Sequence, residues 1–438
     1  MNVHFPMKQL LSILFSTAVG FVFSQQALDL QTCLKMADSA NLSIRNAALD
    51  RSINTAQRSV YLAARYPQLN FNADYKYNAI IQGQVVPGEF FGGPAGTFST
   101  VQFGVPFNLS NTLQLSQILF NPQVNYGLNA LKINNDIVAI QERMVTQEIR
   151  QQVASTFFNL QALSKQLVFV QSNMANMDKL IRNMDAMVKE GLTIQTESDR
   201  LMINKLSLKN SESSLLATKS QLEEYLKILT GMPVDQPIQL QTDGLVEQSL
   251  LVDQTTGTYP EIALIETQQR LNQEERKGTN MSYLPNLSFY AAYNYNYNMK
   301  PEDDFRVGIE GAFVGLRLDW NLFDGMEKVN KQRMNKFNAE KLSNQRLLTE
   351  QQLIMQTKNA TRNISVQTSA LEVSKEQLKL AERVFNQTEA KFKEGVIGST
   401  DLILAENGLQ EAQTNVVSTY IKLRQAELEY LKILGEIR

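Results

Sequence analysis

The chain contains a duplication whose period is close to half its length. The sequence Lys-Glu-Gly at 189–191, followed by Leu-Lys-Ile-Leu at 226–229, recurs at 393–395 and 431–434. The two shifts agree, because 393 − 189 is 204 and 431 − 226 is 205. Solenoid repeats are much shorter, at roughly 20–50 residues. The chain is therefore predicted to consist of two similar halves, each with the order helix, two strands, very long helix, turn and return helix.

The first residues have the features of a secretory signal peptide. Lys8 supplies a positive charge, and the apolar stretch 10–23 that follows is too short to span a bilayer. We predict a signal peptide at 1–24 and an exported mature protein that begins at Gln25. No later segment has the roughly 20 apolar residues of a transmembrane helix. Any part of the chain that enters a membrane is therefore expected to do so as strands.

The composition argues against an enzyme and against a metal site. The only histidine, His4, lies in the predicted signal peptide, and the only cysteine is Cys33. The mature chain thus lacks the usual zinc and copper ligands and the usual pairs of nucleophile and general base. We expect no catalytic residue, no cofactor and no metal, and we interpret Cys33 as a small apolar residue on a helix. The net charge of −2 argues against nucleic acid as a partner.

Each half contains a predicted β-hairpin in which apolar and aromatic residues alternate with Asn, Ser and Gln. The first hairpin, 67–120, has an exposed Gly- and Pro-rich loop at 83–96 and a second strand at about 100–120. The second hairpin, 285–322, has a short acidic turn, and a change of phase near Phe313 suggests a β-bulge. Soluble β-sandwiches also alternate in this way. The signal peptide, the run of tyrosines and the strand length favour strands with lipid on one face and water on the other.

The helical segments are unusually long. A helix is expected at about 30–63, and the helical hairpins 122–230 and 326–436 each begin with a helix that no internal proline interrupts. At about 1.5 Å per residue, these first helices would measure roughly 100 Å. Their sparse apolar positions favour coiled-coil pairing. We assign 25–230 to the first repeat, 231–260 to a connector that packs against the helices, and 261–438 to the second repeat.

Four strands are too few to close a barrel, since small closed barrels begin at about eight strands. An open sheet edge in lipid would leave backbone groups without hydrogen bonds. The strands must therefore contribute to a barrel shared between copies, and three copies would supply about twelve strands. The predicted fold class is all-α with a membrane β-barrel: a long coiled-coil helical barrel plus four strands per chain that complete a trimeric 12-stranded barrel.

With this order of elements, the sequence resembles the TolC-type outer-membrane efflux proteins, also called outer membrane factors. The resemblance covers essentially the whole mature chain. It rests on the duplicated order, on the turns Glu-Gly-Leu at 190–192 and Glu-Gly-Val at 394–396, on the two Leu-Lys-Ile-Leu sequences, and on the opening residues 28–34 with Asn41. The family usually has proline after this asparagine, where this chain has Leu42.

The resemblance implies a homotrimeric duct in the outer membrane, surrounded there by lipid and continued by a helical tunnel into the periplasm. It also implies that the two turns, with Gly191, Leu192, Gly395 and Val396, form the tip that docks a periplasmic membrane-fusion adaptor. An inner-membrane pump of the RND or ABC type would supply the energy. Glycine at each turn can also be explained by helix termination alone, since glycine readily adopts positive φ.

The family commonly closes its periplasmic end with carboxylates, and Asp401 falls on one of those positions. The second position carries Leu404, and the equivalent residues of the first half are Glu197 and Arg200. Asp401 and Glu197 are thus candidate gate residues. Each is equally explained as a favourable charge at the start of a helix, where Thr196, Ser399 and Thr400 are candidate caps.

The leading prediction for function is a passive export duct, the channel-tunnel of a tripartite efflux or type I secretion system. The alternative is a structural scaffold of the cell envelope, a coiled-coil spacer with an outer-membrane anchor. A polar inner face of the strands favours a water-filled lumen and thus the duct. An envelope enzyme that uses paired carboxylates, as glycosidases do, has no obvious substrate cleft in this sequence. The sequence does not identify the cargo.

Overall fold

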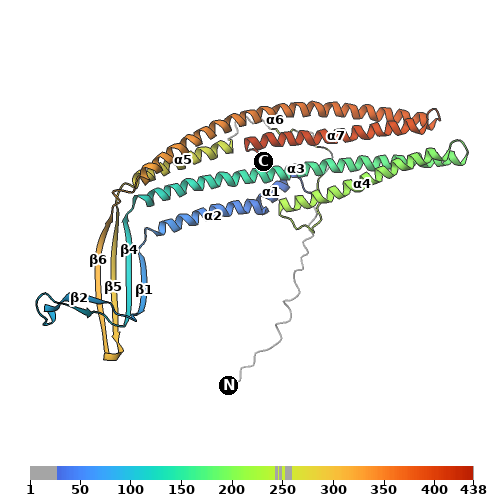
Figure 1. The fold of residues 1–438 in the computed structure, drawn as a ribbon. Helices are drawn as coiled ribbons and strands as arrows, with labels where there is room; N and C mark the ends of the chain where they lie inside the picture. Colours follow the sequence, from blue (N-terminus) through green and yellow to red (C-terminus); the bar gives the residue numbers. More distant parts are fainter. Residues whose placement is uncertain (1–26, 242–244, 246–248, 252–258, 438) are drawn as a thin grey trace, which may run out of the picture.

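The computed structural model describes residues 27–437 except 242–244, 246–248 and 252–258. The predicted signal peptide and much of the predicted connector therefore lie outside the described residues. Figure 1 shows an elongated molecule in which long helices extend from one end of a narrow sheet. The helices are α1 (Leu30–Ala40), α2 (Leu42–Ala63), α3 (Pro122–Lys189), α4 (Gln195–Thr230), α5 (Pro260–Met281), α6 (Glu327–Lys393) and α7 (Ser399–Leu434). The strands are β1 (Gln68–Tyr77), β2 (Gly83–Pro87), β3 (Phe98–Gln102), β4 (Phe107–Phe120), β5 (Asn286–Lys300) and β6 (Phe305–Asp319), with short 3-10 helices η1 (Gly88–Phe91) and η2 (Pro301–Asp303).

The two longest helices, α3 with 68 residues and α6 with 67, confirm the expectation of very long uninterrupted helices. Each packs along its return helix, α4 or α7, and the two hairpins lie side by side (Figure 1). Most helical stability in proteins comes from packing rather than from intrinsic propensity, so these helices depend on their lateral contacts. None of the described helices is both long and apolar enough to cross a membrane.

The main sheet is antiparallel with the strand order β1-β4-β5-β6. Cross-strand partners share a face, so the register defines two chemically different faces. One face has apolar rows such as Leu69, Leu115, Ala291 and Val314, which are paired in sequence across the sheet. The other face is rich in Asn, Ser, Thr and Gln, and Asn108 donates a side-chain hydrogen bond of 2.7 Å to Asn298 there. The predicted division into an apolar and a polar face is thus present in the sheet.

Three local expectations were wrong. The helix expected at 30–63 is divided at Asn41, whose side-chain oxygen accepts hydrogen bonds from the backbone N–H of Ser43 and Ile44 and so begins α2. The loop expected at 83–96 contains β2 and η1, and β2 pairs with β3 in a separate two-stranded sheet. The strand expected at 100–120 is broken before Phe107, because Pro106 cannot donate to a ladder.

The predicted bulge near Phe313 is also wrong. The pairing of β5 with β6 runs without a shift from Asn286–Asp319 to Lys300–Phe305, and the irregularity lies in β4, between Ile118 and Phe120. The change of phase in the sequence of β6 therefore moves its apolar side chains from one face of the sheet to the other. In the outer half of β6, the half away from the helices, Phe305, Val307 and Ile309 lie on the otherwise polar face, and Phe313 near the middle of the strand lies on it as well.

A buried ion pair lies where α7 packs against α3. The Nη1 of Arg424 lies 2.6 Å from Oε2 of Glu427, and both side chains are almost completely buried. The guanidinium group lies over the rings of Phe158 and Tyr420. The second oxygen of Glu427 accepts a hydrogen bond of 3.0 Å from the Ser249 hydroxyl, so this pair also holds a described part of the connector against the helices.

Candidate functional site

The two helical hairpins end in turns of the same construction. In the first, the N–H of Leu192 donates to the carbonyl of Met187 at 2.9 Å, and Gly191 adopts a φ of 70°. In the second, the N–H of Val396 donates to the carbonyl of Lys391 at 3.0 Å, and Gly395 adopts a φ of 71°. This is the Schellman arrangement, in which glycine adopts the left-handed conformation at no steric cost. The two halves of the chain thus end in equivalent tips.

Each tip exposes apolar side chains to solvent. Leu192 is 72% exposed and Val396 is 68% exposed, and Ile194 is also exposed. Scattered exposed apolar residues are normal, but these three all lie in the turns that end the two helical hairpins. The predicted docking residues therefore occupy an accessible position.

The start of α4 contacts the start of α7, and this contact joins the two tips. The hydroxyl of Ser399 donates a hydrogen bond to Glu197 Oε2. The Nη1 of Arg200 lies 3.5 Å from the other oxygen of Glu197 and donates a hydrogen bond of 3.0 Å to the Thr400 hydroxyl. The candidate gate residue Glu197 is thus part of a cross-hairpin network. The sequence could predict this network only in part, because its members come from different halves of the chain.

Asp401 lies in the first turn of α7 and is exposed. It makes no ion pair or side-chain hydrogen bond with the part of the chain that the structure describes. The expected caps were wrong: the N-cap residues are Ile194 and Gly398, so Thr196, Ser399 and Thr400 already lie inside the helices. Each helix begins before these hydroxyl residues, which leaves the Ser399 side chain free to contact Glu197.

Beneath the tips, all four long helices contribute to one apolar cluster: Met177, Leu180, Ile181, Met184, Leu201, Phe385, Phe392, Leu402 and Leu409. One carboxyl group lies next to it. Glu406 is 2% exposed, and neither of its side-chain oxygens has a hydrogen-bond partner. Burial raises the pKa of Glu406 to about 7, and the charge of Glu389 contributes in the same direction. Such perturbed carboxyls are enriched at functional positions.

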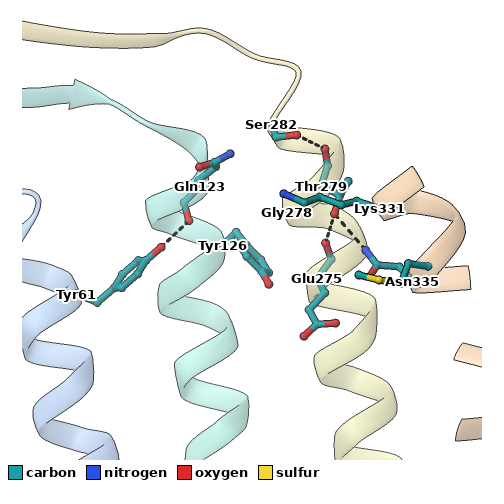
Figure 2. Close-up of a pocket in the computed structure, with 10 residues that line it drawn as sticks. Tyr61, Gln123, Tyr126, Glu275, Gly278, Thr279, Ser282, Lys331 and Asn335 are labelled. Carbon is teal, nitrogen blue, oxygen red and sulfur yellow. Dashed lines mark hydrogen bonds between the residues drawn. The ribbon is translucent and has the colours of Figure 1, made fainter. Parts of the chain in front are cut away.

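At the other end of the helices, where they meet the sheet, two aromatic rings pack on glycines. Figure 2 shows Tyr61 of α2, Tyr126 of α3 and Gly278 of α5 around a pocket of about 380 Å³. A Cβ added to Gly127 of α3 would overlap the Tyr61 ring, and one added to Gly278 would lie 2.5 Å from Tyr126. Asn335 of α6 donates a hydrogen bond of 3.1 Å to Thr279. These contacts set the spacing of neighbouring helices. We call this level of the molecule, marked by Tyr61, Tyr126, Gly127 and Gly278, the waist.

Within the described residues, no group of three or more His, Cys, Asp or Glu side chains is arranged to hold a metal ion. The sites described above consist of exposed apolar tips, hydrogen bonds between the hairpins and a buried carboxyl group.

Comparison with known proteins agrees with these features. The family profile of outer membrane efflux proteins matches residues 33–226 and 251–436, one segment in each half of the chain. No curated protein sequence matches the chain. The solved structure of the outer membrane protein VceC of Vibrio cholerae has a TM-score of 0.69 at 13% identity, over 93% of this chain and 96% of that one. The solved structure of the Campylobacter jejuni outer membrane channel CmeC is also similar. Its TM-score is 0.70 at 13% identity, over 93% of this chain and 85% of that one.

The open state of the Neisseria gonorrhoeae outer membrane channel MtrE is similar as well, with a TM-score of 0.70 at 16% identity over 93% of this chain and 89% of that one. These structures establish the fold and confirm the predicted fold class of long coiled-coil helices with membrane strands. The family match indicates an efflux channel as the general function, and it agrees with the outer-membrane location predicted from the sequence. The chain belongs to the outer membrane efflux protein family, and it is an outer-membrane channel protein that extends into the periplasm.

Proposed function

We propose that three copies of the chain form the channel-tunnel of a tripartite efflux or type I secretion system. In this proposal the tunnel is a passive export duct that docks a periplasmic adaptor, and an inner-membrane pump of the RND or ABC type drives transport. The first repeat spans 25–230 and the second 261–438, so that each copy supplies two membrane hairpins and two helical hairpins. The partners are two further copies, membrane lipid, the adaptor and the pump.

The observation that carries the proposal is the pair of open edges on a sheet with one apolar face. Among the described residues, β1 and β6 each pair with a single strand. Helices α2, α3, α5 and α6 pack in the same order as the strands they join. The two edge helices expose many apolar side chains: Leu42, Leu49, Ile53 and Val60 on α2, and Val329, Met334, Phe337, Leu347 and Leu348 on α6. If β6 pairs with β1 of the next copy and α6 packs on its α2, both edges are satisfied in one ring. Three copies would give twelve strands.

The docking part of the proposal places the adaptor on Leu192 and Val396, beside Gly191 and Gly395. Their exposure at equivalent tips supports a partner that binds both halves of the repeat. The structural scaffold remains the alternative function, since exposed coiled-coil tips would also serve a spacer.

Single-channel recording on the purified protein distinguishes duct from scaffold. We expect stepwise ion conductance in planar bilayers, because the polar strand face would line a water-filled lumen. The double variant Leu192→Asp, Val396→Asp should conduct like the wild type in bilayers but fail to support export in cells that depend on this protein. A complete lack of conductance under conditions that open the tip would favour the scaffold. Export that persists in the double variant would show that the tips are not the docking site for the adaptor.

We also propose that Glu197 and Asp401 contribute to a periplasmic gate, with Glu197 acting through its contacts to Ser399 and Arg200. The double variant Arg200→Ala, Ser399→Ala removes the bonds between α4 and α7. Hydrogen bonds to charged groups contribute about 1.5–3 kcal/mol when partly buried and less when exposed. We therefore expect the ratio of open to closed channels to rise by roughly tenfold, equivalent to about 1.4 kcal/mol. Bilayer recordings measure this ratio.

The matched control is Lys209→Ala, because Lys209 forms its ion pair with Glu212 inside α4 and joins no second hairpin. An unchanged open probability in the double variant would show that the network does not hold the tips closed. In the same recordings, Asp401→Ala tests the second candidate. Unchanged conductance and ion selectivity would rule out Asp401 as a gate residue.

A further inference from the structure

A carboxyl group lies on the apolar face of the main sheet. Glu310 of β6 is paired with Tyr295 of β5, which is paired with Asn111 of β4, so these three side chains form a polar row across the sheet. Val314, four residues along β6, belongs to the apolar row described above and lies on the same face as Glu310. In the proposed barrel this face meets lipid, where a charge is unfavourable unless it lies near the membrane interface.

The height of Glu310 along the strand corresponds to such an interface. Leu318 lies on the same face at the end of β6 next to the helices, and 318 − 310 is eight residues. Eight residues of a strand tilted by about 40° rise about 20 Å, and the apolar band of a membrane barrel is about 25 Å tall. With the band beginning at Leu318, Glu310 lies where the outer lipid headgroups begin, and the residues nearer the helices face acyl chains.

Two tyrosines flank the carboxylate, and we call the group of Tyr293, Tyr295 and Glu310 the cradle. The Tyr293 hydroxyl interacts with the carboxylate from the side nearer the helices. Tyr295 leans toward β6 on the other side, since a Cβ added to Gly308 would lie 2.6 Å from its hydroxyl oxygen. Glu310 itself is exposed. Because a carboxylate only accepts hydrogen bonds and tyrosine rings attract cations, the cradle favours a ligand that is positively charged and carries N–H donors.

The described strands supply no cation to the cradle. Among the residues of β1, β4, β5 and β6 on this face, the only basic one is Arg306, which lies four residues along β6, about 13 Å away, and pairs with Asp304 at 3.7 Å. In a closed ring the β1 strand of the next copy would lie beside Glu310. The β1 residues on this face are Leu69, Phe71, Ala73, Tyr75 and Tyr77, so none of them brings a positive charge.

An apolar groove lies directly next to the cradle, on the side nearer the helices. Its volume is about 410 Å³, and the larger side chains that line it include Leu69, Leu113, Leu115, Tyr293 and Val314. Ala291 and Ala312 line it as well, and their small side chains leave space that larger residues would fill. The groove extends toward the middle of the bilayer, so an acyl chain that descends from a headgroup at Glu310 would lie in it.

We propose that the cradle and the groove together bind one phospholipid with a primary ammonium headgroup, phosphatidylethanolamine. Its ammonium group donates hydrogen bonds to Glu310 between the two tyrosines, and one acyl chain occupies the groove. The negative charge of the cradle selects against lipids whose headgroup is only anionic. The groove is continuous with the lipid-facing surface, so the ligand reaches it from the bilayer. The inference rests on the proposed function, because it takes the apolar face of the sheet as the one that meets lipid.

Native mass spectrometry of the full chain, purified in detergent, tests the headgroup site. Phosphatidylethanolamine and phosphatidylglycerol are added in equal amounts, and the lipids that stay bound are counted. We expect the wild type to bind phosphatidylethanolamine about tenfold more tightly, because charge-assisted hydrogen bonds are the stronger ones. Glu310→Gln should lose this preference, and Glu310→Lys should reverse it. The matched control is Glu302→Gln, an exposed carboxyl change in η2 beyond the strands, which should bind as the wild type does.

Three results would overturn the headgroup site. They are a wild type without a preference, a Glu310→Gln variant with the wild-type preference, and binding of lipopolysaccharide in place of phosphatidylethanolamine that requires Mg²⁺ and is lost with a chelator. The last result would identify a phosphate bridged to Glu310 by a metal ion.

A second variant tests the groove. Ala312→Phe fills it and should weaken the binding of phosphatidylethanolamine about tenfold, whereas unchanged binding would show that no acyl chain lies there. Bilayer conductance of the same preparations reports the duct separately. A wild type that conducts but shows no lipid preference would overturn this inference and leave the proposed function standing. A wild type that does not conduct would count against the proposed function itself.

Discussion

Replacing Arg424 with leucine should destabilise the folded chain by about 3–5 kcal/mol, since it leaves the Glu427 carboxylate buried without its partner. The pair is separated by 2.6 Å, and both side chains are excluded from solvent. The guanidinium group also loses its contacts with the rings of Phe158 and Tyr420. Denaturant titration of the purified protein in detergent, followed by helical circular dichroism, measures the change.

The double variant Arg424→Leu, Glu427→Leu is the matched control. Because apolar residues of similar volume often replace a buried ion pair without loss, most of the stability should return. A single variant as stable as the wild type would show that the carboxylate finds another partner or water. A double variant as unstable as the single one would assign the effect to the lost ring contacts.

Channel opening should increase with pH through the range in which Glu406 loses its proton. The carboxyl group is buried beside the apolar cluster of the tips, and its pKa is raised to about 7 from an ordinary value of 4.5. We take the packing seen in the structure, in which Glu406 is buried, as that of the closed tips. It therefore binds the proton of Glu406 more tightly than an open arrangement that exposes this carboxyl group. Closed packing is favoured at low pH and weakens as pH rises from about 4.5 to about 7, with no further change above that. One pKa unit corresponds to about a tenfold change in the equilibrium, so we expect an increase of about tenfold or more in the ratio of open to closed channels.

The charged groups around Glu406 define the variants. From α6 it is faced by Glu389, which itself forms a 2.9 Å ion pair with Lys393. From α3 and α4 the adjacent cluster presents Met177, Leu180, Ile181, Met184 and Leu201, and the nearby ion pair of Lys205 with Asp178 joins those two helices to each other.

Recordings at a series of pH values on the periplasmic side test this prediction. Glu406→Gln should conduct at every pH as the wild type does at low pH. Glu389→Gln should shift the midpoint to lower pH, because a like charge is removed. Glu411→Gln, an exposed carboxyl change on the same helix, should leave the profile as it is. A wild-type pH profile retained by Glu406→Gln would assign the titration to another group.

Much of the architecture could be predicted from local sequence. The absence of proline and glycine over most of α3 and α6 indicated long helices, and the period of two in β1 and β5 indicated strands with unlike faces. The errors arose where one side chain overrides a pattern. Asn41 divides a helical segment because its amide both caps α2 and donates to the carbonyl of Leu229, 188 residues away.

The tip network could be predicted only in part. Glu197 and Asp401 were identified by position, but the bond between Ser399 and Glu197 depends on how the two halves pack. Glu406 offered a signal that was missed. It follows Leu402 by four residues and precedes Leu409 by three, so a helix places its carboxyl on the same face as two buried leucines. An acidic residue inside such an apolar stripe predicts a buried and perturbed group.

The rings that pack on glycines at the waist have a mechanical consequence. Tyr61 packs on Gly127 and Tyr126 on Gly278, so the neighbouring helices approach closely there and a larger side chain at either glycine would not fit. We infer that, while these contacts persist, the long helices move by tilting about this level. Over the roughly 100 Å of α3, a tilt of about 5° displaces the far end by about 9 Å. A small change of angle at one end of the molecule is thereby converted into a wide change of aperture at the other.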